Sequence, residues 1–211
     1  MRKISFCTNE YYHIYNRGTD KRHIFLEKAD YFRFLIGLQG FNGPKNKADR
    51  LICMYHPLIE AKPRPSTDVW VGIVCYCLMP NHFHLLLQQL QDDGISKYMH
   101  RLGTGYTAYF NLKYKRTGAL FQGVFKAKHA ATEEYVLHLS RYIHLNPSEI
   151  CGETVYEYAW SSLRYYLDSH KPCVVGLTKD VIEKCFGSPK KYREFLARSD
   201  NLLDKDLGID S

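Results

Sequence analysis

The spacing of apolar residues predicts strands and helices in turn along the first half of the chain. YYHIYNR (residues 11–17) alternates apolar and polar positions, which predicts a strand, and an Asn-Arg-Gly turn signal ends it. EKADYFRFLIGLQGF (27–41) carries apolar residues at helical spacing and predicts a helix. VWVGIVCYCLM (69–79) is apolar on both alternating faces, as expected of a strand that is covered on both sides.

The second half continues this alternation. HFHLLLQQ (82–89) follows a Pro-Asn turn and predicts a returning antiparallel strand, whose histidine side we expect to be the less buried one. Residues 94–118 have a helical pattern, and ALFQGVFKAKHA (119–130) predicts a further strand. Thr132 is a good N-cap for a helix over 132–146, which Pro147 ends.

This order of elements predicts an antiparallel α+β sandwich, with helices packed against one sheet. We expect one domain over residues 1–167, interrupted by a Pro- and Lys-rich loop insertion at 42–68. TKDVIEKCF and PKKYREFLA predict a pair of helices, so residues 168–211 are expected to form a helical C-terminal extension.

The composition is that of a soluble globular protein, with 45% hydrophobic and 24% charged residues among 211. No apolar run reaches the roughly 18 residues of a membrane span, and the basic N-terminus lacks the apolar region of a signal peptide. The seven cysteines include no Cys-x-x-Cys pair, which favours reduced thiols. We therefore expect a cytoplasmic protein.

The net charge of +7 is concentrated in one segment of the chain. Residues 94–132 contain no Asp or Glu, although aromatic residues are frequent there. Cations beside aromatic rings suit single-stranded nucleic acid, whose phosphates need charge and whose bases stack on rings; a solvated face with core aromatics is the alternative. The candidate DNA-binding residues are Arg17 and the basic residues of this segment, namely Lys97, Arg101, Lys113, Lys115, Arg116, Lys126 and Lys128.

His82 and His84 share one face of their predicted strand, with α-carbons about 6–7 Å apart. Two imidazoles at this spacing could bind one metal ion, or they could simply be polar residues at the rim of the sheet. Cys75 and Cys77 are expected to be core residues, and a zinc site combining them with both histidines is doubtful because of the intervening turn.

The predicted helix over 132–146 supplies the rest of a possible active site. His138, Tyr142 and Asn146 lie at i, i+4 and i+8, on one stripe of the helix. Asn146 could complete a metal site, Tyr142 could attack a phosphate as nucleophile, and His138 could assist. Imidazole and amide ligands suit Mg²⁺ or Mn²⁺, and Zn²⁺, Co²⁺ or Ni²⁺ could substitute in vitro.

Together these motifs resemble a known family. PNHFHLLL is similar to the His-hydrophobe-His motif of the HUH single-strand endonucleases, and RYIHLNP is similar to the tyrosine motif of the single-tyrosine transposases, in particular the REP-associated tyrosine transposases. The resemblance covers roughly residues 8–167, including YHIYNRG, TGYTAYFNLKYKRTGALFQGVFKAK and YEYAWSSLRYYL.

The resemblance implies a ferredoxin-like α+β fold with the histidines on a central strand. It implies a divalent metal held by His82, His84 and Asn146, and a 5′-phosphotyrosine link between Tyr142 and single-stranded DNA. The expected substrates are hairpins of palindromic repeats or insertion-sequence ends. We expect a monomer, with a homodimer as the alternative.

Other functions remain open from the sequence alone. A domesticated protein could bind hairpin DNA or RNA without chemistry. A two-histidine phosphoesterase normally needs a second His-x-Ser/Thr element on another strand, and no other predicted strand carries one.

Overall fold

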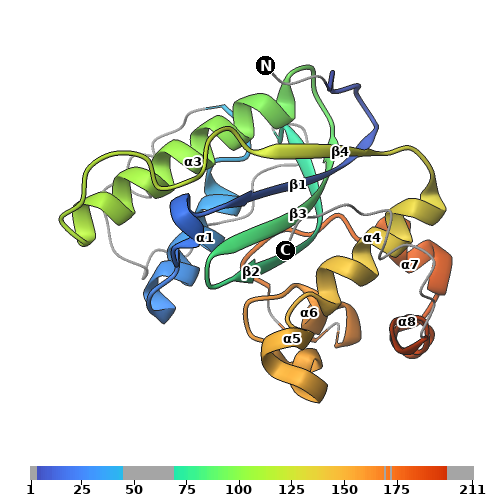
Figure 1. Cartoon of the computed structure of the whole chain (residues 1–211). Helices are drawn as coiled ribbons and strands as arrows, with labels where there is room; N and C mark the ends of the chain where they lie inside the picture. The colour runs from blue at the N-terminus through green and yellow to red at the C-terminus, as the bar shows by residue number, and fades with distance from the viewer. Residues whose placement is uncertain (1–3, 45–68, 169, 172, 199–211) are drawn as a thin grey trace.

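The computed structural model describes residues 4–44, 69–168, 170–171 and 173–198, so most of the predicted insertion at 42–68 lies outside the described residues. Four strands form one antiparallel sheet in the order β2-β3-β1-β4 (Figure 1). The predicted order of elements, from the first strand to the helix that follows the fourth strand, is confirmed for the described residues up to 145. The main elements are β1 (Tyr11–Arg17), α1 (Lys28–Gly40), β2 (Val71–Met79), β3 (His82–Gln89), α3 (Gly94–Lys113), β4 (Lys126–Ala130) and α4 (Glu133–Leu145).

Short helices follow α4 in the C-terminal part of the described chain. They are α5 (Ser148–Cys151), the 3-10 helix η3 (Gly152–Glu157), α6 (Leu163–Leu167), α7 (Asp180–Phe186) and α8 (Pro189–Ala197), and a single 3-10 turn, η1 (Thr19–Lys21), follows β1. None of the described helices is both long enough and apolar enough to cross a lipid bilayer.

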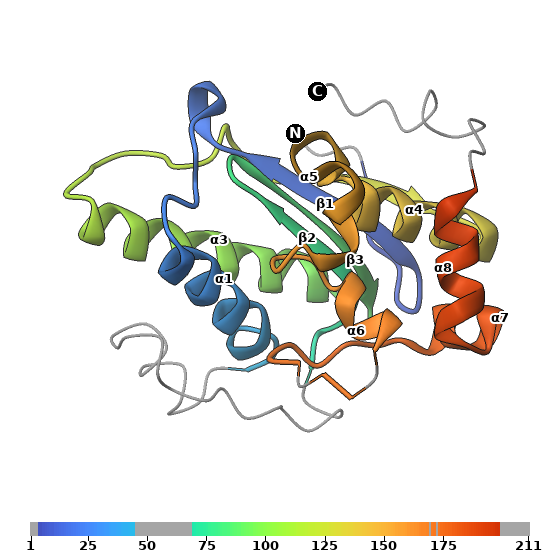
Figure 2. The ribbon, with the colours of Figure 1, turned by 90° about the horizontal axis from the view of Figure 1, so that it is seen from below.

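Helices cover both faces of the sheet. α1 and α3 pack on one face, against residues such as Tyr12, Phe83 and Leu85, while α4, α6 and α8 cover the other face (Figures 1 and 2). The second face is the histidine face, because His84 and Leu86 point toward α4. The expectation that this face is the less buried one is confirmed, since His82 and Gln88 are only partly buried whereas Phe83, Leu85, Leu87 and Gln89 on the other face are all buried. His84 itself lies deep, at 2% exposed.

β4 is shorter than its sequence pattern predicts. Only residues 126–130 pair with β1, and the preceding segment contributes a single bridge between Phe121 and Gly18. Gly118 and Gly123 have φ angles of +84° and +148°. Glycine adopts such angles readily, but they are incompatible with the extended backbone of a β-strand. The segment before Lys126 is therefore a loop beside the end of β1.

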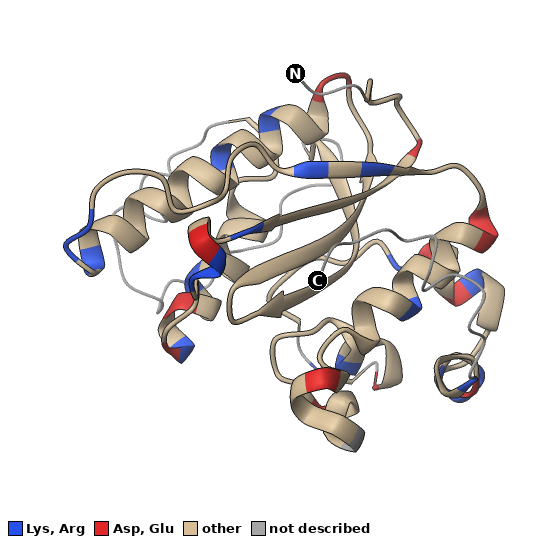
Figure 3. Cartoon of the chain, viewed as in Figure 1, with Lys and Arg blue, Asp and Glu red and all other residues tan. Residues whose placement is uncertain are grey.

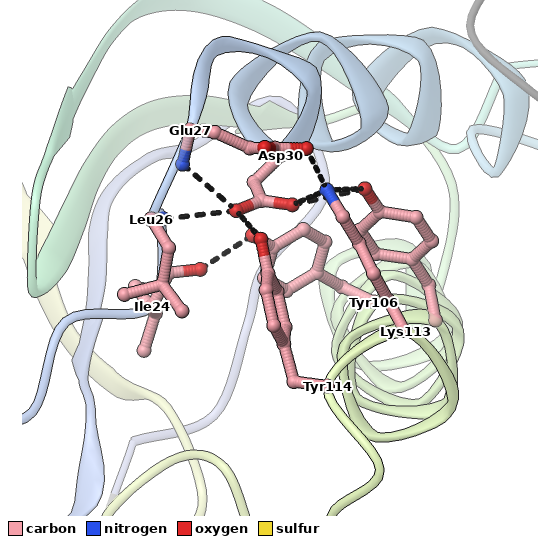
Figure 4. A network of polar contacts seen from close by, with 8 residues as sticks. Ile24, Leu26, Glu27, Asp30, Tyr106, Lys113 and Tyr114 are labelled. Carbon is pink, nitrogen blue, oxygen red and sulfur yellow. Dashed lines mark hydrogen bonds and ion pairs between the residues drawn. The ribbon is translucent and has the colours of Figure 1, made fainter.

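A buried carboxylate joins the start of α1 to the end of α3 (Figure 4). The side chain of Asp30 is 0% exposed and accepts hydrogen bonds from Lys113 at 2.6 Å and from Tyr114 at 2.7 Å. Burial favours a raised pKa for Asp30, but the bonds from Lys113, Tyr114, the Leu26 N–H and Tyr109 outweigh it and lower that pKa. Asp30 is therefore a charged residue that fixes the α1–α3 layer.

The C-terminal helices pack against α4 and hold it through hydrogen bonds. The Tyr192 hydroxyl lies 2.7 Å from His144 Nδ1 and 3.0 Å from Ser140 Oγ, and His144 Nε2 lies 2.8 Å from Ser162 Oγ. Arg141 donates to the carbonyls of Leu196 and Arg198. The extension thus shares a core with the sheet domain and holds the tyrosine helix in place.

Candidate active site

The two histidines of β3 meet β1 and α4 at one end of the sheet. In the register of β1 and β3, Tyr15 lies opposite His84 and Arg17 lies opposite His82, so all four side chains share the α4 face. α4 begins as the sequence predicts, since the Thr132 side chain accepts from the Tyr135 N–H at 3.1 Å. This arrangement brings Tyr142 and Asn146, near the end of α4, to the histidines.

The ring of His82 is oriented by its neighbour Asn81. The Asn81 amide nitrogen donates to the Lys21 carbonyl at 3.2 Å, which leaves its oxygen 2.6 Å from His82 Nδ1. His82 Nδ1 therefore carries the hydrogen, and Nε2 presents a lone pair.

That lone pair faces Asn146. The side-chain oxygen of Asn146 lies 3.3 Å from His82 Nε2, and its amide nitrogen donates to the Tyr142 hydroxyl at 3.4 Å. Two acceptor atoms thus face each other, with no hydrogen between them. Adjacent ligands of a cation bound at about 2.1 Å lie about 3 Å apart, so the pair fits the edge of a divalent-metal site.

His84 lies deeper than His82. Its Nδ1 is 2.9 Å from Nε2 of His13, a residue of β1, and the two rings stack with a centroid distance of 5.1 Å. The Tyr142 ring lies edge-on to His84 at 5.6 Å and to His13 at 6.1 Å. The nucleophile candidate therefore packs directly over the imidazoles.

Burial keeps these imidazoles neutral. Desolvation lowers the pKa of His82 to about 4, with the positive charge of Arg17 adding to the effect and the Asn146 contact opposing it. Desolvation, followed by His13 and His82, lowers the pKa of His84 well below its ordinary value. Neutral imidazole is the form that binds metal, so both rings are ready as ligands at neutral pH.

A cavity of about 900 Å³ opens in front of these residues. Four cationic side chains and one carboxylate, Glu149, line it, so its walls are net positive. Tyr142, His82, His84 and Asn146 all line this cavity; its cations are Arg17, Lys21, Lys126 and Arg141.

The residues fit a Mg²⁺- or Mn²⁺-type site better than a structural zinc site. Within the described part of the chain, no three His, Cys, Asp or Glu side chains come together as metal ligands, so water or substrate would complete the shell. Cys75 and Cys77 are fully buried core residues, and burial raises the pKa of both thiols. The doubtful zinc site with these cysteines is therefore not formed.

The candidate DNA-binding residues separate into two groups. Arg17, Lys126 and Lys128 lie on the histidine face, where the register places Lys126 opposite Tyr15 and Lys128 opposite His13. The other group belongs to α3 and its C-terminal end, in the layer that covers the opposite face (Figure 3): Lys97, Arg101, Lys113, Lys115 and Arg116.

Members of the second group have partners within the fold. Lys113 bonds Asp30 and Glu27, Arg101 donates to the carbonyls of Phe41 and Gly43, and Arg116 donates to Asn111 at 2.8 Å. These contacts assign structural roles to the three residues. The acid-free segment therefore does not form a single basic surface.

The structure does not bring His138 to the site. Its ring lies 5.5 Å from that of Phe195 in α8, and it does not line the cavity. Two residues of the site were not predicted from the sequence: Asn81, which contacts Nδ1 of His82, and His13, which contacts Nδ1 of His84. The available signals were the Asn directly before the His-x-His motif and a histidine between two tyrosines on one face of the first strand.

Comparison with known proteins agrees with this geometry. Residues 56–146 match the family model described as "Transposase IS200 like". The resemblance to the single-tyrosine transposases is confirmed. The match spans the segment that holds His82, His84, Tyr142 and Asn146. No curated protein sequence matches it.

A solved structure supports the fold. It is described as a REP-associated tyrosine transposase bound to a REP hairpin, with a TM-score of 0.52 and 14% sequence identity. The match covers 85% of this chain and 92% of that one. The expected HUH-type α+β fold, with helices packed on an antiparallel sheet, is thereby confirmed.

Proposed function

We propose that the protein is a metal-dependent nickase and strand transferase for hairpin-containing single-stranded DNA. The observation that carries this proposal is the convergence of Tyr142, His82, His84 and Asn146 in one net-positive cavity. All four residues come from one chain, so a monomer is sufficient for the reaction.

In the proposed reaction, the Tyr142 hydroxyl gives up its proton to water and the oxygen attacks the scissile phosphorus. The bond from phosphorus to the 3′ oxygen breaks and that oxygen takes up a proton from water, which leaves a free 3′ hydroxyl and a 5′-phosphotyrosine ester. The ester retains the energy of the phosphodiester bond, so a 3′ hydroxyl can rejoin the strand without ATP. His82, His84 and Asn146 would hold Mg²⁺ or Mn²⁺, which when bound polarises the phosphate and favours phenolate.

Arg17 is placed to bind the phosphate backbone. It lies opposite His82 in the sheet, and its Nε is buried without a hydrogen-bond partner among the described residues. A buried N–H of this kind needs an acceptor, and a phosphate oxygen would supply it. Lys126, which lies over the Tyr15 ring at 5.8 Å, extends the same basic wall.

The substrate class follows from the wall of the cavity and from the structural neighbour. Cations beside the accessible ring of Tyr15 suit an unpaired strand, because phosphates and stacked bases can bind together. The neighbour of similar fold is bound to a REP hairpin, which supports hairpin DNA as the partner here.

The experiment is a cleavage assay with hairpin single-stranded DNAs and Mn²⁺. A DNA labelled at its 3′ end should migrate with the protein through denaturing electrophoresis, whereas the same DNA labelled at its 5′ end should appear as a shorter free fragment. Tyr142→Phe should abolish both products, while Tyr135→Phe, a control on the same helix but outside the cavity, should retain them.

A non-catalytic hairpin binder would give the opposite result. It would bind the hairpins with an affinity unchanged by EDTA and form no adduct with any divalent metal. Normal cleavage by Tyr142→Phe would also contradict the proposal.

A further inference from the structure

His13 lies behind His84 as seen from the cavity. The cavity is lined by His82 and His84 but not by His13, which is 0% exposed. Its Nε2 is 2.9 Å from His84 Nδ1, and its own Nδ1 has no partner among the described residues. Among the proposed metal ligands His13 contacts His84, and its ring also lies against those of Tyr15 and Tyr142.

A single hydrogen must lie between the two rings, and its position decides what His84 can do. If His13 donates it, the proton of neutral His84 sits on Nε2, and that nitrogen cannot bind a cation. If His84 donates it, His84 Nε2 keeps a free lone pair. Only the second arrangement leaves a ligand nitrogen on the ring.

The neighbouring histidine has the same arrangement with a different acceptor. His82 directs its Nδ1 hydrogen to the Asn81 oxygen at 2.6 Å, which leaves Nε2 toward Asn146. Ligand imidazoles usually donate their other N–H to such an acceptor, which fixes the ring and its tautomer. His13 is the acceptor in the corresponding place for His84.

We propose that His13 is a positioning residue, whose Nε2 accepts the Nδ1 hydrogen of His84 and so holds His84 Nε2 free to bind the divalent metal. The inference rests on the proposed function, because it assigns a purpose to the metal site. It places a residue of β1 behind the proposed metal ligands, which themselves come from β3 and the end of α4.

The first test measures Mn²⁺ affinity of the full chain without DNA, by electron paramagnetic resonance. His13→Phe keeps a ring against Tyr15 but removes the acceptor, and should weaken Mn²⁺ binding about 10- to 100-fold. His13→Gln places an amide oxygen near the same point and should restore most of the affinity. His129→Phe, which removes an exposed imidazole from β4, is the matched control and should bind as the unsubstituted protein does.

The second test needs no variant and remains valid if His13→Phe fails to fold. Nitrogen chemical shifts of ¹⁵N-histidine in the Mg²⁺-saturated protein should show the His84 proton on Nδ1, coupled to His13 Nε2. A proton on His84 Nε2, or a metal bound directly by His13, would overturn the inference. So would a folded His13→Phe protein with unchanged Mn²⁺ affinity.

The two proposals fail in different ways. Absence of Mn²⁺ binding by the unsubstituted protein contradicts the proposed function and, with it, the inference. Normal metal binding and adduct formation in both the unsubstituted protein and His13→Phe overturns the inference alone.

Discussion

His82 Nε2 and the side-chain oxygen of Asn146 face each other at 3.3 Å, and the hydrogen bonds around them leave both atoms as acceptors. Asn81 fixes the hydrogen of His82 on Nδ1, and the amide nitrogen of Asn146 donates to the Tyr142 hydroxyl. A cation between two such atoms relieves their repulsion. A bound cation would therefore join the strand that carries the histidines to the helix that carries the tyrosine at the proposed metal site.

Substitution of Asn146 tests this relationship. Asn146→Ala should weaken Mn²⁺ binding by about tenfold or more, because one of three protein ligands is removed. Asn146→Asp should retain or strengthen binding, since it keeps an oxygen and adds negative charge. Both are measured by Mn²⁺ titration without DNA, and equal affinities for the Ala and unsubstituted proteins would contradict the assignment.

The two groups of basic residues should differ in their effect on DNA affinity. In a plot of log K against log salt, the double variant Arg17→Gln/Lys126→Gln should lower the slope by about 0.7 for each phosphate that the protein no longer binds. Lys97→Gln/Lys115→Gln changes the same charge on the α3 layer and should leave the slope unchanged. Fluorescence anisotropy with a labelled single strand measures the DNA affinity of both double variants at each salt concentration. Equal slopes for the two would contradict the separation of the basic residues into a DNA-binding group and a structural group.

Asp30 should contribute to stability and not to chemistry. Asp30→Asn removes the charge that Lys113, Tyr114 and Tyr109 contact, and should lower the free energy of unfolding by about 3 kcal/mol. Asp20→Asn alters an exposed ion pair with Arg22 and should change it by no more than about 0.5 kcal/mol. Urea unfolding compares the two, and similar decreases would contradict the role of Asp30.

Mild acid should destabilise the fold through His144. Burial lowers the pKa of His144 to about 3, below its value of about 6.5 in the unfolded chain, so the unfolded chain takes up the proton first. Stability from this residue is therefore complete above pH 6.5 and declines as the pH falls from there toward 3, by up to about 1.4 kcal/mol per pH unit.

The measurement is urea unfolding at several pH values between 7.5 and 5. His144→Gln has no titrating group at this position, so its free energy of unfolding should fall less steeply with decreasing pH than that of the unsubstituted protein. Parallel pH profiles for the two proteins would exclude this contribution.

The periodic segments of the sequence predicted the sheet and its helices well, because alternation and helical spacing report which side of an element is buried. The limits of β1 and β3 and the N-cap of α4 were predictable in this way. The loop before Lys126 was not, since its alternating residues resemble a strand and only the positive φ angles of its glycines interrupt it.

The candidate site was partly predictable. His82 and His84 share a face by strand geometry, and Tyr142 and Asn146 lie one turn apart on a helix. His138, two turns before Asn146, is about 12 Å from it along the axis, and the stripe also rotates around the helix. His13 contacts His84 because β1 pairs with β3. The basic residues are separated because α3 packs on the face opposite the histidines. Both follow from contacts between distant segments, which local sequence patterns do not reveal.

The role of Tyr142 as nucleophile is best tested by mapping the DNA adduct to a residue. After reaction with a hairpin single strand and Mn²⁺, nuclease and trypsin digestion should yield the peptide of residues 142–164 carrying a 5′-linked nucleotide. This peptide also contains Tyr156 and Tyr158, so fragmentation in the mass spectrometer must locate the modification. The nucleotide should be found on Tyr142, and an adduct on any other residue would contradict the role of Tyr142 as nucleophile.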